Sequence, residues 1–320
     1  MKTVITRNSF ADHVHEKAAM DSIGATLSVG PWDTVDEIVQ HAKDADGIFV
    51  QFSPFTKALI DQLENCKAII RYGIGYDNVD LEAATAKGIQ VCNIPDYCIE
   101  EVADHAVSLA LALGRQLPAL DKRLRKGNWS LSPVTPMHAF REMNFVTYGL
   151  GRIACGIHRR AKAFGFKLHA YDPFVDDALF TETGVSRLHS VEEMFSIADV
   201  LSINAPMTGE NKHLVNKDTL AAMKPTSILI NTARGPLINT VDLAEALNNR
   251  IIAYAGIDVF EEEPIPLDHP LLSCENALLT SHMSYYSESS ITNLQKCAAE
   301  EMVRCLRGGA PKNPVNQIGK

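Results

Sequence analysis

The sequence lacks the marks of a disulfide-rich or membrane-bound protein. Its seven cysteines are an odd number and include no C-x-x-C pair, which fits reduced thiols better than a disulfide framework. The lysine near the start is not followed by the apolar run of a secretion signal, and the most apolar stretch, 106–113, is too short to span a bilayer. We therefore expect a cytoplasmic protein without a membrane partner, and we predict no metal site.

An excess of basic residues is also absent. The 320 residues include 30 Lys and Arg against 39 Asp and Glu, which gives a net charge of −9. Because nucleic-acid phosphates are held by an excess of Lys and Arg, this balance excludes a general nucleic-acid binder. The composition, 46% hydrophobic and 22% charged, is that of a globular protein, and the length allows two domains with separate cores.

Short apolar runs alternate with helical patterns along the chain. Strands are predicted at 4–5, 48–50, 68–70, 89–92, 145–148, 167–171, 200–204, 228–231, 253–258 and 277–280. Helices are predicted at 35–42, 57–63, 81–86, 100–113, 152–164 and 287–306. Strands that alternate with helices form parallel sheets covered on both faces. We therefore predict an α/β protein in which each half is a doubly wound parallel sheet.

A glycine-rich segment, GLGRIACG at 149–156, lies between a predicted strand and a predicted helix. Gly149 permits a tight turn, Gly151 allows a pyrophosphate to approach the backbone, and the small Ala154 allows the helix to pack on the strand. Asp172 ends the next predicted strand, where its carboxylate can accept hydrogen bonds from ribose hydroxyls and would repel a 2′-phosphate. The pattern predicts NAD as the cofactor, in preference to NADP.

Three further segments follow predicted strands of the second half. They are NTARG with Arg234, GIDVFEEEP with Asp258 and Glu263, and TSHMSYYSE with His282. Ligands of doubly wound sheets bind at the carboxyl ends of the strands, so these side chains are candidates for catalysis. Taken singly, each segment also fits a helix cap, a charged surface loop or a structural histidine.

These segments occur in the same order in a known family. Together with RYGIGYDNVDLEAATAKGIQVCNIPDY at 71–97 and EEVADHAVSLALALGR at 100–115, they resemble the D-isomer-specific 2-hydroxyacid dehydrogenases over nearly the whole chain. In that family a Rossmann NAD-binding domain is inserted into a flavodoxin-like substrate-binding domain. The resemblance implies a substrate-binding domain at 1–98 and 286–320, and an NAD-binding domain at 99–285.

The resemblance also implies an activity, the transfer of a hydride between NAD(H) and a small 2-keto or D-2-hydroxy acid of the glyoxylate, hydroxypyruvate or phosphoglycerate type. His282 matches the family's general acid. Glu263 matches the carboxylate that hydrogen-bonds to this histidine, which would favour its protonated form and fix its tautomer. Arg234 matches the guanidinium that binds the substrate carboxylate and polarises the keto oxygen.

The remaining site residues follow from the same resemblance. The implied cofactor contacts are Gly149, Gly151, Arg152, Ile153, Asp172, Ala205, Pro206, Thr232, Ala233, Arg234, Asp258 and His282, with Asp258 facing the nicotinamide carboxamide. The implied substrate contacts are Tyr72, Gly73, Ile74, Gly75, Arg234, His282 and Tyr285, the first four through backbone amides. A homodimer is implied, formed through the helix that begins near Glu100 and through the segment 115–137.

Some positions depart from the family pattern. Thr147 and Tyr148 stand where two aliphatic residues are usual, and Ser281 stands where a proline normally precedes the histidine. VCNIPDYCIEEVADHA and HMSYYSE resemble most closely the branch that includes the C-terminal binding proteins, which are NAD-linked corepressors. An NAD(H)-sensing binding scaffold is therefore the alternative function.

Overall fold

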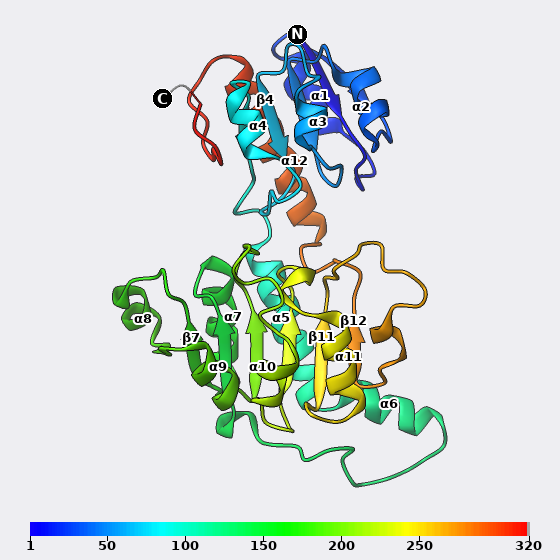
Figure 1. Cartoon of the computed structure of the whole chain (residues 1–320), viewed down its shortest axis with the longest axis vertical. Helices are drawn as coiled ribbons and strands as arrows, with labels where there is room; N and C mark the ends of the chain where they lie inside the picture. Colours follow the sequence, from blue (N-terminus) through cyan, green and yellow to red (C-terminus); the bar gives the residue numbers. More distant parts are fainter. Residues whose placement is uncertain (319–320) are drawn as a thin grey trace. The chain divides into compact units, whose positions relative to one another are not determined.

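The computed structural model describes residues 1–318. The chain forms two compact units (Figure 1), one from Met1–Cys98 with Ser287–Lys320 and the other from Ile99–Tyr286. Two distant parts of the sequence thus build the first unit, while one continuous segment builds the second. Within 1–318, no helix is both long and apolar enough to cross a membrane.

The first unit contains a parallel sheet with the strand order β2-β1-β3-β4-β5. Its strands are β1 (Lys2–Ile5), β2 (Thr26–Val29), β3 (Gly47–Val50), β4 (Ala68–Arg71) and β5 (Gln90–Cys92). Its helices are α1 (Val14–Asp21), α2 (Val35–Ala42), α3 (Lys57–Ile60), α4 (Leu81–Ala86) and α12 (Glu288–Leu306). This strand order is the flavodoxin-like form of the doubly wound fold.

The central strand β3, GIFV, is apolar along its whole length. All four residues of β3 are buried, because helices cover both faces of a parallel sheet. On one of these faces α12 lies close to β3: a Cβ atom on Gly47 would lie 2.4 Å from Sδ of Met302. Helix α12 therefore packs in the same core as the strands from the start of the chain.

The second unit contains a larger parallel sheet with the strand order β12-β11-β10-β9-β6-β7-β8. Its strands are β6 (Asn144–Tyr148), β7 (Lys167–Tyr171), β8 (Ser186–Arg187), β9 (Val200–Ile203), β10 (Ile228–Asn231), β11 (Tyr254–Ile257) and β12 (Ala277–Leu279). Its α-helices are α5 (Ile99–Gly114), α6 (Leu117–Arg125), α7 (Arg152–Ala163), α8 (Asp177–Thr183), α9 (Val191–Ile197), α10 (Lys217–Ala221) and α11 (Thr240–Asn248). Short 3₁₀ turns are η1 (Phe140–Glu142), η2 (Gly235–Leu237) and η3 (Pro270–Ser273).

Successive residues of these strands belong to different cores, as the period of two requires. One row across the sheet, on the side of α5 and α7, is Phe145, Val200, Ile228 and Tyr254. The next row, which packs with residues of α9, α10 and α11, is Val146, Leu201, Leu229 and Ala255. The chain direction across the sheet reverses between β6 and β9, and ligands of such sheets bind at this switch point.

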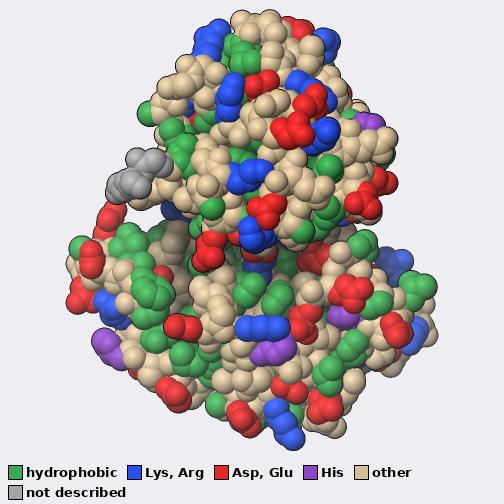
Figure 2. Space-filling view, turned by 45° about the horizontal axis from the view of Figure 1, so that its top comes forward, with side chains coloured by type: hydrophobic (Ala, Val, Ile, Leu, Met, Phe, Trp, Pro, Cys, Tyr) green, Lys and Arg blue, Asp and Glu red, His purple; other side chains and the backbone are tan. Residues whose placement is uncertain are grey.

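The structure confirms the predicted α/β class with two parallel sheets. Several elements were not predicted, including β2, β8, α1 and α6. Others are shorter than expected: the helix predicted at 57–63 ends at Ile60, and the strand predicted at 253–258 covers Tyr254–Ile257. On the face drawn in Figure 2, acidic and basic side chains are interspersed.

Candidate active site

The glycine-rich loop connects β6 to α7 at the switch point of the second sheet. Gly149 has a φ of +96°, and a Cβ atom there would lie 3.2 Å from the carbonyl carbon of Asn204, so a side chain would be strained and crowded. Gly151 is the N-cap of α7, and a Cβ atom built on it has no protein atom within 4 Å. Gly149 is therefore required by the fold, whereas the space over Gly151 is open to a ligand.

Asp172 holds this loop from the end of β7. Its Oδ2 accepts a hydrogen bond from the amide of Leu150 at 2.8 Å, and its Oδ1 accepts one from the amide of Phe174 at 2.9 Å. Each carboxylate oxygen has a second lone pair and can accept a further hydrogen bond. The sequence predicted only the contact of Asp172 with a ribose; its contact with the glycine-rich loop is an additional role that the structure reveals.

Thr147 and His158 form a buried pair at the base of the same loop. The Thr147 hydroxyl donates to the carbonyl oxygen of Gly149 at 2.7 Å and lies 2.9 Å from Nε2 of His158. Since the hydroxyl's single proton goes to Gly149, His158 must donate from Nε2. Burial, with a smaller contribution from the charge of His169, lowers the pKa of His158 from 6.5 to about 3, so the imidazole is neutral. The buried hydroxyl of Thr147, at a position where an aliphatic residue is usual, is therefore satisfied by two hydrogen bonds.

Two polar side-chain atoms at the neighbouring strand ends support a ligand site here. Among residues 1–318, Oδ1 of Asn204 after β9 and Oγ1 of Thr232 after β10 are buried without a hydrogen-bond partner. Such atoms normally find a partner, and a bound polar molecule can supply it. The predicted cofactor residues Arg152 and Ile153 lie in the first turn of α7, and Ala205, Pro206 and Ala233 lie in the loops that follow β9 and β10. These residues fit a dinucleotide.

His282 and Glu263 are in direct contact. Nδ1 of His282 lies 2.7 Å from Oε2 of Glu263, and Oε1 of the same carboxylate accepts the amide of Phe260 at 2.8 Å. Burial raises the pKa of Glu263. The hydrogen bond and charge of His282, the hydrogen bond from the Phe260 amide and the charge of Arg234 together lower it by more, so the pKa of Glu263 lies below its usual value. The ionised carboxylate keeps a proton on Nδ1 and leaves Nε2 to exchange one.

The loop that carries Arg234 is fixed by its own side chains and by close packing. Asn231 closes the turn after β10, donating from Nδ2 to the carbonyl oxygen of Arg234 at 2.9 Å and accepting the amide of Ala233 at 3.0 Å. A Cβ atom on Gly235 would lie 1.9 Å from the carbonyl carbon of Phe260. This contact brings the loop of Arg234 against the loop of Glu263.

Asp258 orders the loop around His282. Its side chain is fully buried, and its carboxylate accepts the amides of Met283 at 2.9 Å and Ser284 at 3.0 Å and the hydroxyl of Thr280 at 2.6 Å. These hydrogen bonds outweigh burial, which alone raises the pKa, and hold the pKa of Asp258 below its usual value. The nicotinamide contact expected of Asp258 stays a prediction, whereas its hold on this loop is a finding.

The backbone of His282 has an uncommon conformation within that loop. Its φ is +54°, in the left-handed region that residues other than glycine seldom adopt. The amide of His282 donates to the carbonyl oxygen of Asp258 at 2.7 Å, which helps to hold it there. Tyr285 follows in the same loop, with its ring centroid 6.3 Å from that of His282 in an edge-to-face arrangement.

The predicted carboxylate-binding loop lies in the first unit, after β4. The carbonyl oxygens of this loop accept hydrogen bonds from the chain itself. The amide of Ile94 donates to the carbonyl oxygen of Gly73, and the side-chain amide of Asn93 donates to that of Ile74. Within residues 1–318, the amides of Gly73, Ile74 and Gly75 have no backbone or side-chain acceptor. Successive unpaired amides form a concave site for an anion.

Tyr72 departs from this expectation. Its amide donates to the carbonyl oxygen of Val50 at 2.8 Å, so it is not available to an anion. Its side chain is buried, and its hydroxyl donates to Oε1 of Glu16 at 2.7 Å. The prediction of Tyr72 as a substrate contact through its amide is therefore wrong, because the parallel pairing of β3 and β4 continues one residue further than the sequence indicates.

Comparison with known proteins identifies a family and related structures. The family model "D-isomer specific 2-hydroxyacid dehydrogenase, NAD binding domain" matches residues 107–284, which lie within the second unit. A solved D-lactate dehydrogenase from Aquifex aeolicus, complexed with NAD and lactic acid, superposes with a TM-score of 0.91 at 26% identity and covers 99% of this chain and 100% of its own.

Relatives known by sequence differ in length from this chain. A D-3-phosphoglycerate dehydrogenase of Methanocaldococcus jannaschii is 35% identical over 95% of this chain, which spans 58% of that relative. A glyoxylate reductase of Korarchaeum cryptofilum is 33% identical over 88% of this chain and 85% of its own length. The similarity therefore extends over both units.

Proposed function

Because the chain belongs to the D-isomer-specific 2-hydroxyacid dehydrogenase family, we propose that it transfers a hydride between NAD(H) and a small 2-keto acid, which becomes a D-2-hydroxy acid. The observation that carries this proposal is the pair of His282 and Glu263, whose side chains are 2.7 Å apart, with the loop of Glu263 packed against that of Arg234. A histidine held by an ionised carboxylate is a proton donor of the kind that reduction of a keto group needs.

The residues of this chain then have separate tasks. NADH, when bound, supplies the hydride that C2 of the keto acid receives. His282 donates a proton from Nε2 to the developing alkoxide, and Glu263 stabilises the imidazolium and fixes its tautomer. Arg234 binds the substrate carboxylate and polarises the keto oxygen through its planar guanidinium. In the first unit, the unpaired amides of Gly73, Ile74 and Gly75 are available to an anion such as a carboxylate.

The experiment that tests this function is NADH oxidation with a panel of 2-keto acids, including glyoxylate, hydroxypyruvate, phosphohydroxypyruvate and pyruvate. We expect at least one acid to be reduced with a kcat/KM of about 10⁴ M⁻¹s⁻¹ or more. Tight binding of NADH without turnover of any acid would contradict the proposed dehydrogenase activity and favour a binding scaffold that senses NAD(H).

We propose NAD as the preferred cofactor because Asp172 stands at the end of β7. A carboxylate at this position accepts hydrogen bonds from ribose hydroxyls and repels a 2′-phosphate. The ratio of kcat/KM for NADH and NADPH tests this assignment. We expect NADH to be preferred, and we expect Asp172→Asn to reduce the preference because it removes the negative charge. Equal use of both cofactors by the unaltered protein would contradict the role of Asp172.

We also propose a homodimer in the cytoplasm. None of the nine residues of α6 is buried, and the following segment exposes Trp129 and Leu131, whose exposed fractions are 78% and 92%. The segment is nevertheless held in place by the side chain of Gln116, which accepts a hydrogen bond from the amide of Val134 and donates one to the hydroxyl of Thr135. A second copy of the chain would cover these apolar side chains.

All seven cysteines are free, as expected in a reducing compartment.

Sedimentation analysis tests the dimer. We expect the unaltered chain to sediment as a dimer, and we expect the double variant Trp129→Glu, Leu131→Glu to sediment as a folded monomer. Phe174→Glu is the matched control, since Phe174 is 92% exposed but lies outside this segment. A monomeric unaltered chain, or dissociation by the control alone, would contradict the proposed interface.

A further inference from the structure

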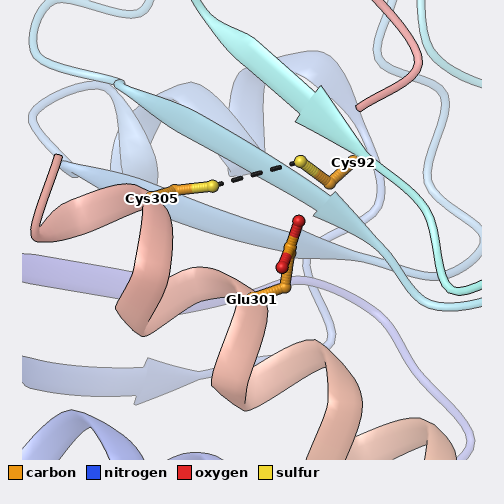
Figure 3. Close-up of side chains that lie close together, drawn as sticks. All are labelled: Cys92, Glu301 and Cys305. Atoms are coloured by element: carbon orange, nitrogen blue, oxygen red, sulfur yellow. Dashed lines mark hydrogen bonds between the residues drawn. The ribbon is translucent and has the colours of Figure 1, made fainter. Parts of the chain in front are cut away.

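Two cysteines and a glutamate from separate parts of the first unit meet at one point (Figure 3). Cys92 is the last residue of β5, while Glu301 and Cys305 lie one helical turn apart on α12. Cys92 and Glu301 are buried, and Cys305 is partly exposed. The two Sγ atoms are 4.0 Å apart, and both sulfurs and a carboxylate oxygen of Glu301 lie within 4.8 Å of one another.

The distance between the sulfurs matches a metal site better than a disulfide. Two thiolates bound to one tetrahedral zinc ion lie about 3.8 Å apart, since each Zn–S bond is about 2.3 Å long. A disulfide requires the sulfurs to approach to about 2 Å. The observed 4.0 Å therefore needs an adjustment of only a few tenths of an ångström to hold zinc.

The carboxylate of Glu301 is already oriented by the chain. Its Oε1 accepts the amides of Lys312 at 2.6 Å and Asn313 at 3.1 Å, and its Oε2 accepts Nε of Arg304 at 3.1 Å. Ligating carboxylates are commonly held in this way by hydrogen bonds from outside the metal's own shell. Oε2 has a second lone pair, so it can bind a cation while it keeps Arg304.

The charges of this cluster would balance with a divalent cation. Two thiolates and the Glu301 carboxylate give three negative charges, and a divalent cation with Arg304 gives three positive charges. Glu301 and Arg304 also line a surface pocket together with Asp96, Cys297 and Lys312. Of the three clustered residues, Glu301 lines this pocket, which a cation and a water molecule can enter.

We propose that Cys92, Glu301 and Cys305 form a zinc site, with the two thiols losing their protons to solvent on binding and a water molecule as the fourth ligand. The site lies where three segments meet. Besides β5 and α12, the terminal segment takes part: Pro314 forms a bridge with Cys92, and Val315 donates to the carbonyl oxygen of Val91. A bound ion would join these segments and stabilise the discontinuous first unit. The proposal does not depend on the activity of the protein.

Metal binding by the full chain tests the site. Reduced, chelator-treated protein without an affinity tag is titrated with Co²⁺ and then with Zn²⁺. We expect one ion per chain, with the thiolate-to-cobalt charge-transfer band and the visible bands of tetrahedral cobalt, both lost when Zn²⁺ displaces it. We also expect Zn²⁺ to raise the Tm, because it binds the folded chain preferentially.

Variants identify the ligands. Cys92→Ser, Cys305→Ser and Glu301→Gln should each weaken Zn²⁺ binding by more than about 100-fold. Cys297→Ser is the matched control on the same helix, two turns before Cys305, and should bind as the unaltered chain does. Because Cys305 is partly exposed, its serine variant should fold, and its Tm should not respond to Zn²⁺.

Several results would overturn the proposal. One is the absence of stoichiometric Zn²⁺ binding to the reduced protein. Another is cobalt binding without the thiolate band, or binding that the Cys305→Ser variant retains. A third is a Cys92–Cys305 disulfide in protein handled without an added oxidant, found by mass spectrometry together with a reduced form that binds no metal.

Discussion

The hydroxyl of Thr147 and the imidazole of His158 lie 2.9 Å apart in the core of the second unit, and the same hydroxyl donates to the carbonyl oxygen of Gly149. We expect Thr147→Val to remove this support and to leave Nε2–H of His158 buried without a partner. The cost should be about 1–3 kcal/mol of unfolding free energy, together with weaker NADH binding.

A double-mutant cycle separates the pair from simple packing. Adding His158→Leu to Thr147→Val should restore part of the lost stability, because replacing both partners leaves no buried group unpaired. Urea unfolding measures the stabilities, and NADH fluorescence measures binding. Strictly additive effects of the two substitutions would show that the pair is not coupled.

The same histidine predicts a pH dependence of stability. The pKa of His158 is about 3 in the folded chain against 6.5 normally, so between these pH values the unfolded chain takes up a proton that the folded chain does not. The unfolding free energy therefore falls as the pH drops below 6.5, by about 2 kcal/mol at pH 5. His158→Gln, which keeps a donor for Thr147 but does not titrate, should not show this loss.

Urea unfolding at pH 7 and pH 5 checks this dependence. The exposed His189→Gln variant is the control and should lose as much stability as the unaltered chain. If the His158→Gln variant lost the same amount, the buried imidazole would not be the cause.

Gly151 offers a test of the cofactor loop that leaves the fold intact. A Cβ atom there has no protein neighbour within 4 Å, so Gly151→Ala should cost less than about 1 kcal/mol of stability. The same Cβ would project toward a bound pyrophosphate, and we expect NADH affinity to fall at least about tenfold. Gly209→Ala, also in open space, is the matched control. Unchanged NADH affinity in the Gly151 variant would place the pyrophosphate elsewhere.

Gly235 tests the contact between the loops of Arg234 and Glu263. Gly235→Ala would place a Cβ atom 1.9 Å from the carbonyl carbon of Phe260, so the loops of Arg234 and Glu263 must separate. We expect a loss of about 1–3 kcal/mol in the unfolding free energy and a lower kcat/KM. Thermal unfolding and steady-state kinetics measure the two effects. A variant with normal stability and turnover would show that this contact does not position the site.

The proposed catalytic residues can be tested directly. Arg234→Ala and His282→Ala should each lower kcat/KM by at least about 10²-fold while the Tm stays near that of the unaltered chain. Arg234→Lys should recover little of the loss, because an ammonium group cannot form the paired hydrogen bonds of a guanidinium. Near-normal turnover by either alanine variant would remove the role assigned to that residue.

The sequence predicts most of the second sheet and less of its edges. Strands β9 and β10, VLSI and ILIN, are read easily because burial on both faces makes them largely apolar. Strand β2, with the sequence TLSV, was missed, since it is an edge strand with exposed residues at both ends. Helix α6 was missed because it buries none of its residues and so has no apolar stripe facing a core.

For the candidate site, the sequence identifies candidate residues but not the hydrogen bonds that hold them in place. Glycines, acids and His282 stand out through their spacing from predicted strands. The loop-ordering role of Asp258 depends on amides more than twenty residues away, which only the folded chain brings together. Cys92 and Cys305 are separated by most of the sequence, so no local pattern could pair them.

Helix α12 completes a sheet whose five strands all precede residue 93. During synthesis the ribosome must produce the whole second unit before this helix emerges, which takes ~10–40 s at about 5–20 residues per second. For that period the surface of β3 and β4 that α12 covers lacks its partner, while the second unit can fold as a continuous segment. The first unit therefore exposes apolar surface for longer during synthesis than a unit built from one continuous segment would.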